Sequence, residues 1–597
     1  MATTIPSKTT TEIAALTTTE IAALTTEDWA AFSAAQVVAL TTTQIGSIAT
    51  SGLRAMQAAS AAAFETSDMN LMSVSQFNAF TSTQITALTT TQFSSLSTTL
   101  LDGMTTTQFR GLEGQDLAVI GTTALNTLTA SQVGAITATA MQSLTTTQIS
   151  NLGATQIGGL TTAQVAGLGT TTLNALSASQ FDNLTTTQLR SMTATQVAAL
   201  ETTDLAGLSA SKIPGFNTTQ IDALGTTQLA AFTPTQVAAF TSSQLRAIPA
   251  AELATMGTTQ LAALGTSQVA ALTPTQVDGL TTTQLVAFSA TQMGGFTTAQ
   301  LSGLGTTDLN AFTTTQFAAL RSSQIAGLTA TQVGAMETGD LVVLSTAQVR
   351  GLSTAAVEAL STTQFDALST TQVGALTSGQ LRAIPGSDLA SVSTTQLAAL
   401  GTAQVAALTT TQVDALTTNQ LVSLGTSAVA AFTTTQLSAL GTSDLNALGT
   451  TQFGALRTSQ LAGLTTGQIA NLETTDLASL STAQVRGFTT AQIDAMGTTQ
   501  LASLTSSQFG ALTSGQVRGI STSDLSALGT TTLAGLTTAQ VAALTTAQVD
   551  GLTTNQMVAL ATNQVAAFNS AQLRALGTSD LDAFTTTQFA AFKTGQL

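Results

Sequence analysis

Large apolar residues recur along this chain at a fixed interval of eight. Every residue whose number is a multiple of eight, from Leu16 to Phe592, is Leu, Ile, Val, Met or Phe. A second apolar residue follows five positions later, as Val413 follows Leu408, and Ala61 is the one small exception. No insertion or deletion interrupts this octapeptide, so the pattern predicts equivalent units stacked in one regular lattice.

We number each octad from the multiple of eight, so that the unit L-T-T-T-Q-V-A-A has its large apolar residues at positions one and six. One continuous α-helix advances about 800° per octad and would wind these residues around its surface. One continuous strand would place the two positions on opposite faces, because they are an odd number of residues apart. The pattern therefore favours a short helix restarted in every octad, in which Val413 and Leu416 are neighbours at i and i+3.

Start and stop signals for such a helix are present in each octad. Thr at position two and Gln at position five make the capping box T-x-x-Q, and Pro234 and Pro274 occupy the first helical position, where proline is tolerated. Arg prefers position seven, near the end of the helix, where the helix dipole favours a cation. Glycine is frequent at position two, and we expect it to end the preceding helix in the left-handed conformation. These glycines include Gly225, Gly257, Gly305, Gly401, Gly441, Gly497 and Gly577.

Helices this short are marginal in isolation, so stacking must stabilise them. We predict an all-α solenoid with one short capped helix per octapeptide and two to four octads per coil. Positions one and six face inward, and the Thr-rich corners face outward. The alternative is a β-solenoid, because Thr, Val and Ile are good strand residues. Residues 1–15 lie partly outside the register, and residues 16–597 form one continuous solenoid.

A longer repeat of 136 residues, or 17 octads, is superimposed on the octapeptide. It relates Glu65, Glu201, Glu337 and Glu473, and also Arg110, Arg246, Arg382 and Arg518. Duplication of whole blocks explains this spacing, and a regular contact along a rod is the functional interpretation. If two octads made one coil, Arg321 and Glu337, which are 16 residues apart, would stack as an exposed ion pair.

Composition excludes several classes of function. The net charge is −16, and only 14 Lys and Arg are scattered along 597 residues, so no basic stripe is available for nucleic acid. Cys, His and Tyr are absent, which removes disulfides, thiol and imidazole catalysis and the commonest metal ligands. No apolar run is long enough for a transmembrane segment or a Sec signal peptide, so we expect any export to be leaderless and type-I-like.

No residue set stands out as a catalytic, cofactor-binding or metal site, and we expect no enzyme and no cofactor. The pairs Glu201–Asp204 and Glu473–Asp476 invite a general acid/base or calcium interpretation, but both fit the decoration of a helix N-terminus. Serine and threonine are plentiful, yet no histidine or lysine base accompanies them. Trp29 and the methionines, such as Met192, Met256 and Met496, occupy core positions.

The unit L-T-T-x-Q-[VI]-x-A-L, seen in residues 536–560, resembles the Thr/Gln/Ala-rich short repeats of bacterial surface or secreted proteins of S-layer or adhesin type. The resemblance implies an extracellular or cell-surface location. We expect a structural protein that self-associates, end to end or laterally, into a surface layer, filament or stalk. The last octad stops at Leu597, position six, so we expect either that the chain is a fragment or that its open end docks onto another copy. The alternative is an adhesin or ice-binding protein with outward Thr ladders, for which a cell-surface polysaccharide is a possible ligand.

Overall fold

Short helices make up the regular structure of this protein. The computed structural model describes residues 4–596, from the 3₁₀-helix η1 (Ile5–Ser7) and α1 (Thr10–Ala14) to α72 (Thr586–Phe589). Each α-helix begins at octad position three and is four to six residues long, and one octad holds instead the 3₁₀-helix η2 (Ala210–Gly215). The part of the chain that is described contains no strand. The prediction of an all-α solenoid is confirmed, and the β-solenoid alternative is wrong.

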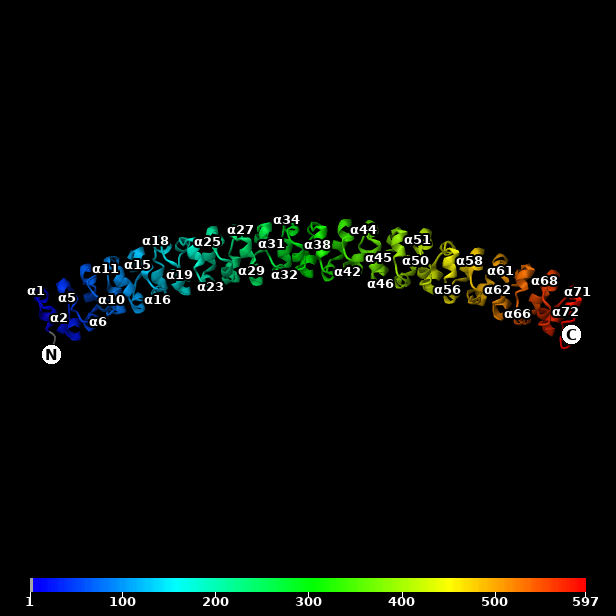
Figure 1. Cartoon of the computed structure of the whole chain (residues 1–597), viewed down its shortest axis with the longest axis horizontal. Helices are drawn as coiled ribbons and strands as arrows, with labels where there is room; N and C mark the ends of the chain where they lie inside the picture. The colour runs from blue at the N-terminus through cyan, green and yellow to red at the C-terminus, as the bar shows by residue number, and fades with distance from the viewer. Residues whose placement is uncertain (1–3, 597) are drawn as a thin grey trace. The chain divides into compact units, whose positions relative to one another are not determined.

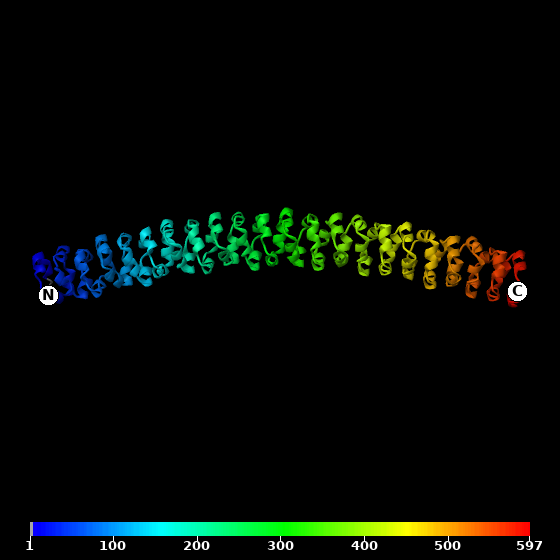
Figure 2. The ribbon, with the colours of Figure 1, turned by 45° about the horizontal axis from the view of Figure 1, so that its top comes forward.

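The chain divides into two compact units, Met1–Leu304 and Gly305–Leu597. The first contains α1 to α36 (Thr298–Gly303), and the second contains α37 (Thr306–Asn310) to α72. Within each unit the short helices follow one another in chain order along its length (Figure 1). The turned view shows the same order within each unit (Figure 2). Residues 1–3 and 597, the outermost positions of the predicted segments 1–15 and 16–597, lie outside the described range.

The predicted capping box starts these helices. In α50 (Thr410–Asp414), the N-cap Thr409 accepts a hydrogen bond of 3.1 Å from the backbone N–H of Gln412. The Gln412 side-chain oxygen accepts one of 2.8 Å from the backbone N–H of Thr409 in return. Pro234 and Pro274 occupy the first helical position of α28 (Pro234–Val237) and α33 (Pro274–Asp278), as predicted.

The expected left-handed glycines are not found, and that prediction is wrong. No residue in the described range has a positive φ. Gly225, with φ −83° and ψ 171°, is the extended N-cap of the helix that follows it. Position one already ends the preceding helix in an extended conformation, as Leu408 does with φ −56° and ψ 144°. Consecutive helices therefore share a two-residue junction that leaves no place for a left-handed residue.

Contacts between helices fix the size of a coil. α50 packs against α47 (Gly386–Ser391) and α53 (Thr434–Ala439), each three helices away. The side chain of Gln412 reaches Ile384, at the end of α46 (Ser378–Ala383), which lies four helices earlier. A coil therefore contains between three and four octads, within the predicted range of two to four. Arg321 and Glu337 are two octads apart and so do not stack directly in successive coils, and that stacking hypothesis is wrong.

The core follows the two predicted apolar positions. Val413 at position six is 0% exposed and Leu416 at position one is 3% exposed, and even the small Ala61 is fully buried. Burial of each large side chain contributes roughly 1.5 to 3 kcal/mol. Thr-rich corners such as residues 313–315 are exposed, as predicted. The apolar core thus runs through consecutive coils of each unit and is flanked by polar corners.

Candidate functional site

The glutamine at position five joins successive coils. Gln412 is 3% exposed, and its Nε2 donates hydrogen bonds of 2.6 Å to the carbonyl oxygen of Leu381 and 2.7 Å to that of Ile384. Both carbonyls lie at the end of a helix, where intrahelical partners run out, although that of Leu381 also accepts a hydrogen bond of 3.2 Å from the backbone N–H of Ile384. One side chain therefore caps the start of its own helix through Oε1 and the end of a helix in the previous coil through Nε2.

The same pair of contacts recurs in both units. The acceptors lie 28 and 31 residues before the glutamine, at octad positions one and six. Glutamines with both contacts include Gln76, Gln84, Gln148, Gln196, Gln244, Gln380 and Gln468. We call this arrangement the inter-coil staple. The sequence predicted only the capping bond that the glutamine Oε1 accepts. The bonds that Nε2 donates could not be predicted, because their acceptors are backbone atoms that no side-chain pattern reveals.

Two substitutions show what the staple requires chemically. Lys212 occupies position five, and its Nζ donates a hydrogen bond of 2.6 Å to the carbonyl oxygen of Leu184, 28 residues earlier. Ser60 occupies position five as well, and its hydroxyl donates one of 2.6 Å to the carbonyl oxygen of Phe32. Gln, Lys and Ser share a hydrogen-bond donor and little else. Gln, Lys and Ser at position five therefore all aim a donor at the preceding coil, whereas octads with a position-five residue such as Ala124 or Ala356 fold without it.

Acidic residues at position five cannot act as donors when ionised. Glu12 and Glu20 are exposed and cap only their own helices. The hydrogen bond from the backbone N–H of Thr9 lowers the pKa of Glu12, and the corresponding bond from Thr17 lowers that of Glu20. Asp524 is half-buried and accepts a hydrogen bond of 2.6 Å from the hydroxyl of Thr498, 26 residues earlier.

A second group of aspartates turns inward. Asp68, Asp116, Asp204, Asp340 and Asp476 are at most 4% exposed, and each follows a glutamate at position two of the same octad. One carboxylate oxygen of Asp116, of Asp204 and of Asp476 is buried without a hydrogen-bond partner. A buried, unpaired carboxylate oxygen is costly because its charge is poorly solvated. Proton uptake reduces that cost.

The pKa values of these inward aspartates reflect this burial. Burial raises the pKa of Asp204 to about 6, with a further increase from the nearby charge of Glu201. The same two causes raise the pKa of Asp340 and of Asp476 to about 6. The Glu201–Asp204 and Glu473–Asp476 pairs therefore sit at helix N-termini, as interpreted from the sequence, but the aspartate of each pair is inside.

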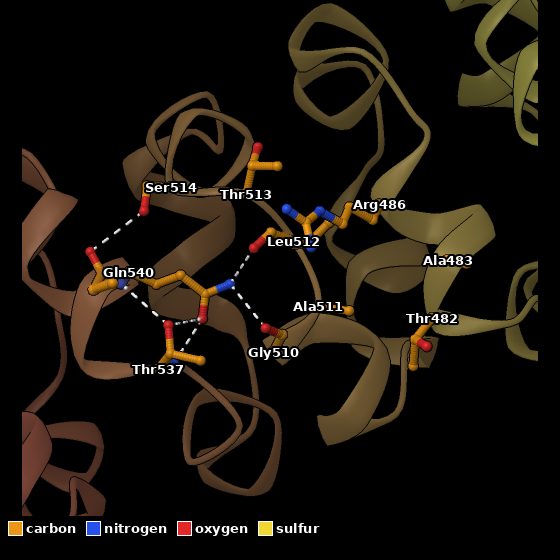
Figure 3. Close-up of a pocket in the computed structure, with 11 residues that line it drawn as sticks. Thr482, Ala483, Arg486, Gly510, Ala511, Leu512, Thr513, Ser514, Thr537 and Gln540 are labelled. Carbon is orange, nitrogen blue, oxygen red and sulfur yellow. Dashed lines mark hydrogen bonds between the residues drawn. The ribbon is translucent and has the colours of Figure 1, made fainter.

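Surface hollows recur beside arginines at position seven. One of about 560 Å³ lies between α59 (Thr482–Arg486), the end of α62 (Ser506–Gly510) and the start of α66 (Thr538–Ala543). In Figure 3 the Arg486 side chain extends from its helix toward Leu512 and Thr513, and Gln540 makes its inter-coil staple beside the same hollow. The lining combines one cation with hydroxyl groups and small apolar side chains.

Two similar hollows lie in the first unit. One of about 430 Å³ contains Arg54 of α6 (Thr50–Ala55), together with Ser75 and Asn78 near α9 (Val74–Phe77). Another, of about 310 Å³, contains Arg190 of α23 (Thr186–Ser191) and Pro214 of η2. In all three the arginine lies between a helix and its neighbour three helices further along. We call these three hollows the open arginine grooves.

Other arginines at position seven instead donate hydrogen bonds to backbone carbonyls of the chain. The Nε of Arg246 donates a hydrogen bond of 2.9 Å to the carbonyl oxygen of Ala271, and that of Arg382 donates one of 3.0 Å to Ala407. Both acceptors end the helix three places further along. Arg54, Arg190 and Arg486 make no such bond to the residues the structure describes. Their guanidinium groups are exposed.

The remaining residues singled out from the sequence are structural. Trp29 is fully buried and stacks on Phe32 with 4.6 Å between ring centroids. Met192, Met256 and Met496 lie in the core. Over residues 4–596, no group of three or more acidic, His or Cys side chains is arranged to hold a metal ion. None of the helices described is long and apolar enough to cross a lipid bilayer.

Two solved structures are remotely similar to the chain. A structure of APUM23-GGAAUUGACGG covers 80% of this chain and 92% of its own, with 12% identity and a TM-score of 0.16. A structure of APUM23-GGAUUUGACGG covers 72% and 84%, with 11% identity and a TM-score of 0.13. No curated protein sequence matches the chain.

The family comparison is specific. The model of the ALTTAQ repeat matches segments that together span more than half of the chain. These segments are residues 61–98, 197–234, 237–274, 245–282, 301–338, 333–370, 358–385, 383–418, 437–474, 469–506, 517–554 and 557–594. The matched repeat is the Thr/Gln/Ala-rich octad whose glutamine forms the inter-coil staple. The chain belongs to the ALTTAQ repeat family.

Proposed function

We propose that this ALTTAQ-repeat chain is a structural protein that self-associates into a surface layer, filament or stalk outside a bacterial cell. The observation that supports the proposal most is the inter-coil staple. Each coil provides the hydrogen bonds and apolar contacts that the next coil needs. Adding octads therefore adds coils through one recurring interaction, as a scaffold protein requires. We propose a non-enzymatic role for the chain.

The proposed location rests on composition and on the resemblance to repeats of surface proteins. The chain is acidic and contains no Cys, so it needs no disulfide-forming machinery after export. Its 14 Lys and Arg in 597 residues offer few sites to trypsin-like proteases. We propose export by a leaderless route. A protease of broad specificity, applied to intact cells, should degrade the chain, and persistence of the full-length chain when the same protease digests the purified protein would contradict a surface location.

Self-association is tested with the purified full-length chain. Light scattering and negative-stain electron microscopy over a concentration series should show regular filaments or sheets above a threshold concentration. A chain that remains monomeric and dispersed over the whole series would overturn the proposal. A cell-surface polysaccharide, the other partner considered, is tested by adding it during the same series and measuring whether the threshold changes.

The exposed Thr-rich corners support a second candidate, an adhesin or ice-binding protein. Thr313, Thr314 and Thr315 are all exposed, and equivalent residues recur in most octads. Here these residues start helices, whereas a flat ladder would require extended strands. Thermal hysteresis of the purified chain would support the ice-binding candidate, and its absence would remove that candidate without affecting the structural proposal.

A further inference from the structure

We propose that the open arginine grooves receive acidic side chains of a second copy of this chain, so that copies pack side by side in a fixed register. The inference rests on the proposed self-association and names the residues that carry the lateral contact. It begins from the three exposed guanidinium groups of Arg54, Arg190 and Arg486, which make no hydrogen bond to residues 4–596.

The chemistry of the grooves selects a carboxylate. A guanidinium group binds a carboxylate through two parallel N–H···O bonds, and neighbouring hydroxyls supply further donors. Thr482, Thr513 and Ser514 accompany Arg486, and Thr50 and Ser51 accompany Arg54. These lining residues include no acidic side chain to compete for the arginine. No aromatic ring is among them either, so the stacking surface that a sugar ring would use is missing.

A second copy offers the matching groups in abundance. The chain carries 30 Asp and Glu against 14 Lys and Arg, so most carboxylates have no cation of their own. The glutamates at position two, Glu65, Glu201, Glu337 and Glu473, are exposed, and none uses its side chain to cap its helix. They stand at the outer corners of their coils, where an adjacent molecule can reach them.

Equal spacing of the two charges provides the register. In the first unit, Arg54 and Arg190 are 136 residues apart, and so are Glu65 and Glu201. In the second unit, Glu337 and Glu473 repeat this separation, and Arg486 lines the open arginine groove. Because the octads are equivalent, equal separations along a unit correspond to equal displacements. In the first unit the glutamates thus repeat at the same interval as the arginine grooves, which is the match that a parallel neighbour in fixed register needs.

Repetition compensates for the weakness of each contact. An exposed ion pair changes an association constant by up to about fivefold. Several pairs that form together multiply these factors, because the first contact holds the others at high effective concentration. The contact is heterologous, since arginine grooves of one copy meet glutamates of the next. It can therefore propagate from copy to copy, as a layer or filament requires.

The test compares two sets of arginines in the full-length chain. The triple variant Arg54→Gln, Arg190→Gln, Arg486→Gln removes the cations from the open grooves. The matched control, Arg246→Gln with Arg382→Gln, removes arginines that already bind the chain's own carbonyls. Sedimentation velocity at about 0.15 M NaCl, where charge repulsion is screened beyond about 8 Å, measures assembly. We expect the triple variant to assemble at least tenfold more weakly than the control.

A charge exchange makes the test specific. Two variant chains are compared. The first carries Arg54→Glu, Arg190→Glu and Arg486→Glu, and the second carries Glu65→Arg, Glu201→Arg, Glu337→Arg and Glu473→Arg. Each should assemble poorly alone, and the two should assemble together when mixed. Wild-type assembly that the groove variants leave unchanged would overturn the groove proposal while leaving self-association intact. A wild-type chain that never assembles would overturn self-association itself. Circular dichroism of every variant verifies that its helices remain folded.

Discussion

The Nε2 of Gln220 donates a hydrogen bond of 2.7 Å to the carbonyl oxygen of Met192, 28 residues earlier in the chain. The same amide donates one of 2.8 Å to Leu189. Both acceptors belong to the preceding coil, so the contact joins coils and not residues of one octad. It explains why position five is glutamine in most octads, although glutamate would cap the helix start equally well.

Replacing a staple glutamine should weaken the stack locally. In Gln412→Met the side chain keeps a similar length but loses its donors, which leaves the buried carbonyls of Leu381 and Ile384 without that partner. An unsatisfied buried polar group costs about 1–3 kcal/mol. Native-state hydrogen exchange should show that α46 and α50 open more readily by an amount in this range.

A neighbouring exposed residue provides the control for that substitution. Thr411 lies one position before Gln412 and is exposed. Thr411→Ala should change the exchange of the same two helices by less than about 0.5 kcal/mol. If Gln412→Met and Thr411→Ala change the opening free energy equally, the hydrogen bonds of the inter-coil staple do not stabilise the stack.

Stability should depend on pH through the inward aspartates. The folded-state pKa of Asp204, about 6, lies above the ordinary value of 3.8, so the folded chain binds this proton more tightly than the unfolded chain does. The stabilisation is complete below about pH 4 and is lost as the pH rises toward 6. Asp340 and Asp476 act in the same direction. Thermal unfolding followed across pH 4 to 7 should show a falling midpoint.

The triple substitution Asp204→Gln, Asp340→Gln, Asp476→Gln should restore a donor at each position. We expect higher stability at pH 7 and a flatter dependence between pH 4 and pH 6. The exposed Asp222 provides a matched control, because Asp222→Asn removes a carboxylate outside the staple. If the stability of the triple variant still depends on pH to the same extent, groups other than these three aspartates cause the pH dependence.

Close packing between coils should be sensitive to a single methyl group. A Cβ added at Gly351, in α42 (Thr346–Gly351), would lie 2.7 Å from the backbone carbonyl oxygen of Ser322. The backbone of α39 (Ser322–Ile325) must then shift, at a cost of about 1–3 kcal/mol. Thermal unfolding of Gly351→Ala measures this loss.

Gly158 provides the opposite expectation. It lies in α19 (Ala154–Gly159), and an added Cβ there meets nothing within 4 Å. Gly158→Ala should stabilise the chain by up to about 1 kcal/mol, because alanine restricts the unfolded chain and favours helix. If both glycine substitutions behave alike, contact between coils does not decide their effect.

Local features of the octad could be predicted from the sequence because their causes are local. Thr409 and Gln412 identified the helix start, and the spacing of Val413 and Leu416 identified the buried face. The second role of Gln412 could not be predicted, because its acceptors are backbone atoms whose distance depends on the coil size. The left-handed Gly225 was predicted from a helix end seen in isolation, and the immediate start of the next helix removed that conformation.

A measurement of the number of octads per coil tests the solenoid structure most directly. Gly374 and Ala399 are 25 residues apart, and a Cβ built on Gly374 lies 3.8 Å from that of Ala399, close to the separation of about 3.8 Å found in disulfides. The added Cβ also lies 3.0 Å from the carbonyl oxygen of Ala399, so the backbone must shift by a few tenths of an ångström to accept it. The chain has no cysteine, so Gly374→Cys with Ala399→Cys introduces the only two thiols. A coil of two octads would instead place Gly374 beside Ala390. Mild oxidation and peptide mass spectrometry should find the 374–399 cross-link in nearly all chains, and none in Gly374→Cys with Ala390→Cys. Cross-linking of the second pair without the first would contradict a solenoid of between three and four octads per coil.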